Sequence, residues 1–121
     1  MSQAEALADT ARTALRCLDL TLLGDDDQAA DIEQLCRRAT GPCGDVAAVC
    51  VWPRFAALAR QRLPARIAVA AVANFPAGGT ELPDALADVG QAVDAGAQEV
   101  DLVLPWRALR HGDDAAAARL L

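Results

Sequence analysis

The sequence has 121 residues, a hydrophobic content of 54% and a formal net charge of -6. This length and composition fit one globular domain with a buried core and exclude a disordered chain. The acidic balance, with no basic stripe to oppose it, argues against nucleic acid and anionic membranes as partners. No apolar run reaches the ~20 residues of a membrane span. Glu5 and Asp9 stand where a secretory signal carries positive charge, so we expect a cytoplasmic protein.

The residues that most often bind metals or form Schiff bases are scarce in this chain. All 11 residues of the Lys and Arg class are arginine, and there is no lysine. The only histidine is His111, and the cysteines include no C-x-x-C pair. We therefore expect structural thiols and no metal or other cofactor. The four cysteines are Cys17, Cys36, Cys43 and Cys50.

The first part of the chain predicts a helix and then a strand. Ser2 is a possible N-cap of a helical pattern that runs to about Thr13. In residues 14–21, Leu18 and Leu20 alternate with polar side chains, which is typical of a strand with one polar face.

A second helix is expected after the acidic turn at residues 24–27, because acids are favoured at the positive end of the helix dipole. Apolar residues then recur at helical spacing until Gly41 and Pro42 end the pattern. The core-facing positions of this helix are Ile32, Leu35, Cys36 and Ala39.

A second strand is predicted from Val46 to about Val51, and it leads directly into a helix. Pro53 begins that helix, since proline is favoured in the first helical turn, and the pattern continues to Leu63. The expected buried stripe is Phe55, Leu58, Ala59 and Leu63.

Residues 67–72 predict a third strand that is apolar on both faces, as in sheets covered on both sides. A loop at residues 74–79 follows, and Thr80 or Pro83 begins the next helix, which Gly96 closes just past the C-cap. We expect this helix to bury Leu86, Val89 and Val93.

Residues 97–106 predict a buried fourth strand, around which the remaining chain is organised. Val100, Leu102 and Leu104 share one apolar face. The opposite face carries Glu99 and Asp101, and carboxylates are costly to desolvate unless they meet partners, water or a substrate. Parallel strands place their ligand sites at their carboxyl ends. Asp101 is therefore our leading candidate for chemistry, and a buried acid satisfied by a neighbouring strand is the alternative.

Four strands, starting near residues 15, 46, 67 and 99 and each followed by a helix, make a repeated βα unit and predict a parallel sheet. A small doubly wound sheet and part of a (β/α)8 TIM barrel both fit. A doubly wound sheet covers both faces of its central strands. The polar side chains of the first and fourth strands need a polar interior, which favours a TIM barrel. Residues 1–121 would supply its first four βα units and form an incomplete domain, since a complete barrel takes ~250 residues.

Four segments carry a more specific pattern. They are Leu18-Asp19-Leu20-Thr21 with Asp25-Asp26-Asp27, Ala48-Val49-Cys50-Val51-Trp52-Pro53-Arg54-Phe55, Asn74-Phe75-Pro76-Ala77-Gly78, and Gly96-Ala97 with Glu99-Val100-Asp101-Leu102-Val103. In order and spacing they resemble segments of the deoxyribose-phosphate aldolase family. The resemblance covers essentially all 121 residues of this chain but only the first half of that family's barrel.

The resemblance implies a class I aldolase with a (β/α)8 fold. Such an enzyme reversibly cleaves 2-deoxy-D-ribose 5-phosphate to acetaldehyde and D-glyceraldehyde 3-phosphate through a lysine Schiff base, without a metal. Asp101 matches an aspartate that passes protons with a water and a second lysine. Asp19 matches a position near that relay, Thr21 and Cys50 match positions in the same pocket, and Asn74 with Phe75 matches the loop beside it.

The sequence departs from the family in having no lysine for the Schiff base. Arginine stays protonated and forms no ordinary Schiff base, so we expect this chain alone to be inactive. A related Schiff-base aldolase for another sugar phosphate, or a non-enzymatic half-barrel module for assembly or small-molecule binding, are the alternatives. Because the first and fourth strands would be open edges, we expect self-association or a need for the missing carboxyl-terminal half.

Overall fold

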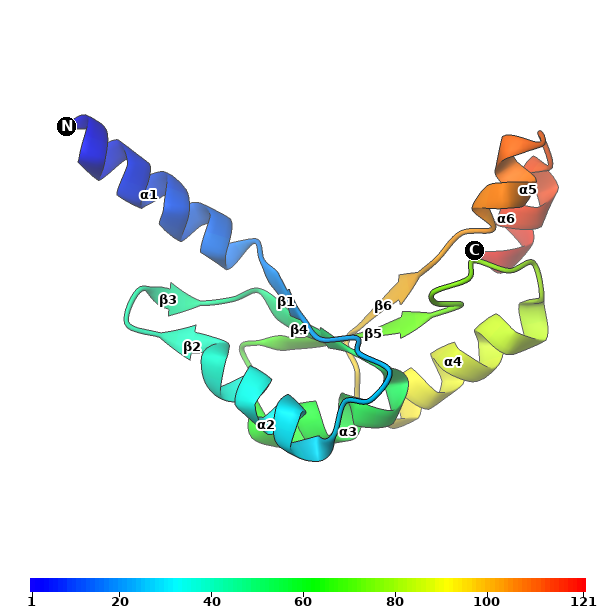
Figure 1. The fold of residues 1–121 in the computed structure, drawn as a ribbon, viewed down its shortest axis with the longest axis horizontal. Helices are drawn as coiled ribbons and strands as arrows, with labels where there is room; N and C mark the ends of the chain where they lie inside the picture. Colours follow the sequence, from blue (N-terminus) through cyan, green and yellow to red (C-terminus); the bar gives the residue numbers. More distant parts are fainter.

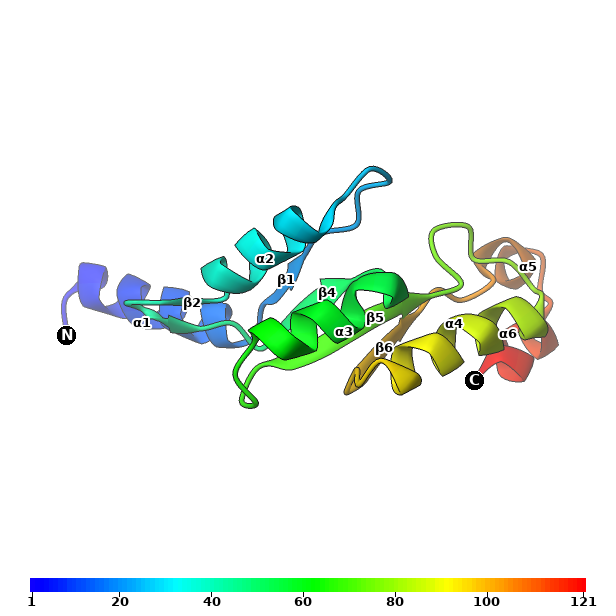
Figure 2. The same cartoon turned by 90° about the horizontal axis from the view of Figure 1, so that it is seen from below.

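The computed structural model describes residues 1–121 and contains a four-stranded parallel sheet with helices on one face (Figures 1 and 2). The strand order is β1-β4-β5-β6, so the first and last strands are the two edges. The predicted parallel order is confirmed. The strands are β1 (Asp19–Thr21), β4 (Ala48–Val51), β5 (Ala68–Ala73) and β6 (Glu99–Leu102).

Three helices, α2 (Ala29–Arg38), α3 (Pro53–Arg62) and α4 (Leu82–Asp94), lie on the same side of the sheet. Figure 1 shows them below the strands, and Figure 2, seen from below, shows them in front. No helix covers the opposite face in either view. This arrangement, with helices outside and one bare inner face, is that of a segment of a (β/α)8 barrel.

The remaining elements lie at the ends of the sheet (Figure 1). Helix α1 (Gln3–Arg16) extends away at one end, while α5 (Trp106–Arg110) and α6 (Asp114–Leu120) pack on each other at the other end. The short hairpin of β2 (Thr40–Gly41) and β3 (Gly44–Asp45) was not predicted. None of the helices has the length and apolar character needed to cross a membrane.

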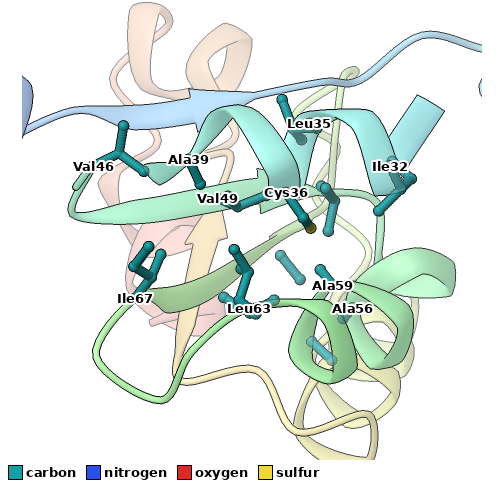
Figure 3. Close-up of a cluster of buried hydrophobic side chains, with 14 residues drawn as sticks. Ile32, Leu35, Cys36, Ala39, Val46, Val49, Ala56, Ala59, Leu63 and Ile67 are labelled. Atoms are coloured by element: carbon teal, nitrogen blue, oxygen red, sulfur yellow. The ribbon is translucent and has the colours of Figure 1, made fainter. Parts of the chain in front are cut away.

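The core lies between the sheet and the helices α2 and α3 (Figure 3). Alternate strand residues such as Val49, Val51 and Val69 point into it, and each is fully buried. The four residues that were predicted to face the core from the second helix are all buried, so this prediction is confirmed. Three of them lie in α2 and the fourth, Ala39, is its C-cap. The other buried members of the cluster are Ile32, Leu35, Cys36, Ala39, Val46, Ala56, Ala59, Leu63, Ile67, Ala71 and Ala92.

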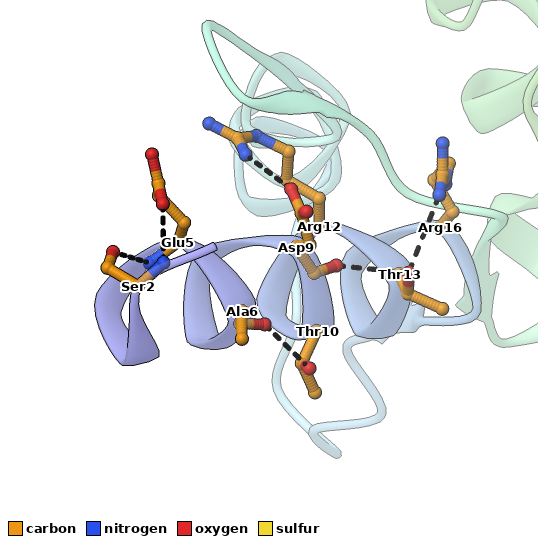
Figure 4. Close-up of polar contacts among 8 residues, drawn as sticks. All are labelled: Ser2, Glu5, Ala6, Asp9, Thr10, Arg12, Thr13 and Arg16. Carbon is orange, nitrogen blue, oxygen red and sulfur yellow. Dashed lines mark hydrogen bonds and ion pairs between the residues drawn. The ribbon is translucent and has the colours of Figure 1, made fainter.

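Helix α1 is stabilised by local hydrogen bonds, since none of its residues is buried. Ser2 and Glu5 form a capping box, in which the Glu5 amide donates to Ser2 Oγ and the Ser2 amide donates to Glu5 Oε2 (Figure 4). The predicted N-cap is confirmed. The helix continues to Arg16, three residues beyond the expected end, so the prediction of a strand from residue 14 is wrong and β1 begins only at Asp19.

Two predictions of burial are also wrong. Strand β6 was expected to be buried, but Glu99, Val100 and Asp101 are exposed because no further strand pairs with this edge. In α4, the expected core positions Leu86 and Val93 are 59% and 60% exposed, and Val89 is only half-buried. The small side chains of Ala85 and Ala92 face the sheet instead.

Candidate active site

The strand register brings polar side chains together on the face that no helix covers. Thr21 pairs with Cys50 across β1 and β4, and Val72 pairs with Asp101 across β5 and β6. Paired residues of parallel strands point to the same side of the sheet. Cys50 and Val72 belong to the small buried cluster on this face, whereas Val49 and Val51 belong to the main core.

A cavity of about 260 Å³ opens on this face at the carboxyl ends of the strands. It is mainly apolar, with a hydroxyl, a thiol and a carboxylate as its polar groups. Parallel α/β folds bind their ligands at this end of the sheet. The lining residues are Thr21, Leu23, Cys50, Val72, Phe75, Asp101, Leu102 and Val103.

The Cys50 thiol donates a weak hydrogen bond to the Asp101 carboxylate, with 3.7 Å between Sγ and Oδ2. Cys50 is 2% exposed, and its burial, followed by the negative charge of Asp101, raises the pKa of the thiol to about 11. The thiol is therefore neutral at pH 7 and acts as a donor. This contact is the only side-chain hydrogen bond of Asp101, which forms no ion pair. The carboxylate thus remains open to solvent and to a ligand.

Aromatic side chains support the wall of the cavity. The rings of Trp52 and Phe75 meet edge to face, with 5.3 Å between their centroids. Trp52 Nε1 donates to the carbonyl oxygen of Gly24 at 3.1 Å, which ties the loop after β1 to the end of β4. The Arg54 guanidinium lies 5.1 Å from the Trp52 ring centroid. These contacts fix Phe75 beside the cavity.

Asn74 holds the loop after β5 in place and does not line the cavity. It has a φ of 56°, a backbone conformation that Asn adopts more readily than most residues. Its Nδ2 donates to the carbonyl oxygens of Gly79 and Val103 at 2.8 and 2.9 Å. Its amide donates to Asp88 Oδ2 at 2.9 Å. Asn74 therefore joins this loop to α4 and to the end of β6.

The structure brings four of the six sequence-predicted site residues to one cavity, namely Thr21, Cys50, Phe75 and Asp101. The other two, Asp19 and Asn74, do not line the cavity. The negative charge of Asp19 is a minor cause of the raised pKa of Cys50. Val72, Val103, Leu23 and Leu102 line the cavity as well, and none of them was predicted to be a site residue. Alternation along residues 97–106 puts Val103 on the same strand face as Asp101, which is a signal that could have found it. No group of three or more metal-binding side chains is arranged to hold an ion.

Comparison with known proteins identifies the family. Residues 13–120 match the family described as DeoC/LacD family aldolase. A Toxoplasma gondii ME49 structure, named as a deoxyribose-phosphate aldolase, superposes with a TM-score of 0.83 at 25% identity, over 97% of this chain and 45% of that one. An Aeropyrum pernix deoxyribose phosphate aldolase gives 0.65 at 20% identity, over 98% and 57%.

A structure from Coccidioides immitis, also named as a deoxyribose-phosphate aldolase, gives a TM-score of 0.75 at 22% identity, over 97% of this chain and 54% of that one. The chain therefore spans about half the length of these relatives. The predicted fold class and family are both confirmed: this chain belongs to the DeoC/LacD family of aldolases and contains part of their (β/α)8 barrel.

Proposed function

We propose that this chain supplies the amino-terminal half of the active site of a cytoplasmic deoxyribose-phosphate aldolase. That enzyme reversibly cleaves 2-deoxy-D-ribose 5-phosphate to acetaldehyde and D-glyceraldehyde 3-phosphate through a lysine Schiff base. The observation that carries the proposal is the position of Asp101. Its carboxylate lies exposed on the helix-free face, lines the cavity and has no basic partner.

Asp101 is the proton carrier in this proposal. A carboxylate without an ion-pair partner can accept a proton from the substrate and return it during the formation and breakdown of the Schiff base. The neutral thiol of Cys50 donates to Oδ2 and so limits the rotation of the carboxylate. The apolar side chains of Val72, Phe75 and Val103 exclude water from one side of the cavity.

The amine that forms the Schiff base comes, in this proposal, from outside these residues. An iminium requires a primary amine that can lose its proton, and the sequence contains no lysine. The α-amino group of Met1 lies at the far end of α1, away from the sheet (Figure 1). The chain alone is therefore inactive in aldol cleavage.

Two measurements test this proposal. Borohydride reduction of the chain with acetaldehyde should give no adduct within the cavity, and a modified side chain there would contradict the assignment of the amine. Residues 1–121 joined to the remaining half of the Toxoplasma gondii relative should cleave 2-deoxyribose 5-phosphate, with that relative's full chain as the positive control. A chimera that forms the borohydride-trapped adduct but cleaves another sugar phosphate instead would assign a different substrate.

The second candidate is a non-enzymatic half-barrel module for assembly or small-molecule binding. The observation that favours it is the mainly apolar cavity of about 260 Å³ on the helix-free face, which has the size and lining to hold a small molecule. Under this hypothesis the chimera would show no cleavage even when its borohydride-trapped adduct forms. The same chimera therefore separates the two functions.

A further inference from the structure

The loop after β5 and the segment after β6 lie against each other at the cavity. The loop covers residues 74–79, and the segment covers residues 103–107. Phe75 lines the cavity from the loop, and Val103 lines it from the segment. The two stretches therefore form one wall of the cavity, which we call the loop wall.

Two side chains hold the loop wall together by hydrogen bonds to backbone carbonyl groups. At one end, Asn74 Nδ2 donates to the carbonyl oxygen of Val103 at 2.9 Å. At the other end, Arg107 Nη1 donates to the carbonyl oxygen of Ala77 at 2.7 Å. The Arg107 guanidinium also lies 4.0 Å from the centroid of the Trp106 ring, which limits its movement. Because its donor is charged, the Arg107 hydrogen bond is the stronger of the two.

Between these hydrogen bonds, the backbone at Gly78 packs directly against the segment after β6. A Cβ at Gly78 would lie 2.9 Å from both Trp106 Cδ1 and Val103 Cγ1. The loop therefore cannot move toward the segment without displacing Val103, and movement away from it breaks the Arg107 hydrogen bond. The position of the loop thus sets the positions of Phe75 and Val103 together.

We propose that Arg107 is a positioning residue that fixes the width of the cavity and thereby limits the aldehyde in the Schiff base to two carbons. The inference rests on the proposed function and names the specificity of the same site. Arg107 does not line the cavity, so it acts through Phe75 and Val103. A rigid apolar pocket distinguishes ligands that differ by one methylene by about 10-fold to 200-fold. A released loop wall loses this discrimination, because it yields to the longer aldehyde.

Alkylation of Cys50 in the 121-residue chain tests whether Arg107 holds the loop wall. Cys50 is 2% exposed and belongs to the cluster against which Phe75 packs, so iodoacetamide reaches the thiol only when the wall opens. At one fixed pH, Arg107→Ala should raise the alkylation rate about 10-fold, because a hydrogen bond that closes the wall is lost. Arg110→Ala is the matched control, since it removes the same charge from an exposed position of α5, and it should leave the rate unchanged.

Cys36 separates opening of the loop wall from unfolding of the whole chain, because it is buried in the main core. Its alkylation rate should be the same in the unsubstituted chain and in both variants. An unchanged rate at Cys50 in Arg107→Ala would overturn the proposal. Equal rises at Cys50 and Cys36, or a rise in Arg110→Ala that matches the rise in Arg107→Ala, would overturn it as well.

The chimeric barrel tests the limit on the aldehyde. The unsubstituted chimera should form the borohydride-trapped adduct with acetaldehyde in preference to propanal. Arg107→Ala should lower this preference about 10-fold while acetaldehyde is still trapped, and Arg110→Ala should not change it. An unchanged preference in Arg107→Ala would overturn this proposal and leave the proposed function intact. A chimera that traps neither aldehyde would overturn both, and the Cys50 rates would then show only whether Arg107 holds the wall.

Discussion

The Cys50 thiol and the Asp101 carboxylate meet across the intervening strand β5, with 3.7 Å between Sγ and Oδ2. The two residues lie 51 positions apart in the sequence, and the parallel register brings both side chains to one cavity. Because the charge of Asp101 acts on the thiol, Cys50 reports on the ionisation and position of the proposed proton carrier.

The reactivity of Cys50 should depend on Asp101. Burial and then the Asp101 charge raise the thiol pKa to about 11, so alkylation should be slow at neutral pH and should rise toward that pH. Asp101→Asn removes the charge and should shift this profile to lower pH. The alkylation rate of each cysteine, measured by mass spectrometry, tests the prediction. Exposed Cys17 is the internal control, and an unchanged Cys50 profile in the variant would contradict it.

The free energy of unfolding should fall at alkaline pH. The folded pKa of Cys50 is about 11 against an ordinary value of 9.0, so folding favours the neutral thiol. The neutral thiol therefore stabilises the folded chain fully below pH 9, and this contribution is lost as the pH rises to about 11. The free energy of unfolding should fall by about 2 kcal/mol over this range. Burial also raises the pKa of Cys36, which acts in the same direction. Urea unfolding across this pH range should show a smaller loss for Cys50→Ala than for the unsubstituted chain.

Gly78→Ala should be more destabilising than Gly112→Ala. Both glycines have a positive φ, of 64° and 84°. A Cβ at Gly78 would lie 2.7 Å from the carbonyl oxygen of Leu104, whereas a Cβ at Gly112 would meet nothing within 4 Å. We expect a loss of about 1 kcal/mol for Gly112→Ala, from backbone strain alone, and about 3 kcal/mol for Gly78→Ala. Equal losses in urea unfolding would show that the Leu104 contact is relieved without cost.

Asn74→Asp should destabilise the loop after β5 more than Asn74→Gly. The aspartate keeps the shape of the side chain but replaces Nδ2, with its two N–H donors, by one oxygen that faces the carbonyls of both Gly79 and Val103. Glycine loses the same hydrogen bonds but adopts the positive φ freely. We expect losses of about 3 and about 1.5 kcal/mol in urea unfolding. The reverse order would mean that backbone conformation, and not the amide group, fixes this loop.

The sequence predicted the parallel order of the four main strands and the starts of α1 and α3, where one local signal dominated, but it placed the start of β1 too early and missed the β2–β3 hairpin. Pro53 begins α3 as expected, and Ser2 caps α1. The predictions failed where burial depends on a neighbour. The spacing of Leu86 and Val93 correctly marks one face of α4, but no element covers that face, so both side chains remain exposed. The same reason explains the exposure of Val100 at the β6 edge.

The candidate site was predictable only in part. Alternation along a strand places Cys50 and Asp101 on inner faces, and the family resemblance indicated the same positions. Their distance, however, depends on the register of three strands, which no local pattern contains. Asn74 was expected at the pocket because the family resemblance matches it to the loop beside the pocket. Its side chain is instead used within the protein, a role that its positive φ indicates only after the fold is known.

The most direct measurement is the turnover of 2-deoxyribose 5-phosphate by the chimeric barrel with and without Asp101→Asn. Borohydride trapping of acetaldehyde in both chimeras controls for assembly and for the amine. We expect Asp101→Asn to lower kcat by about 100-fold to 10,000-fold. The free energy of unfolding should change little, because an exposed carboxylate is replaced by an amide of the same shape. Full turnover by a variant that still traps acetaldehyde would contradict the assignment of Asp101 as the proton carrier.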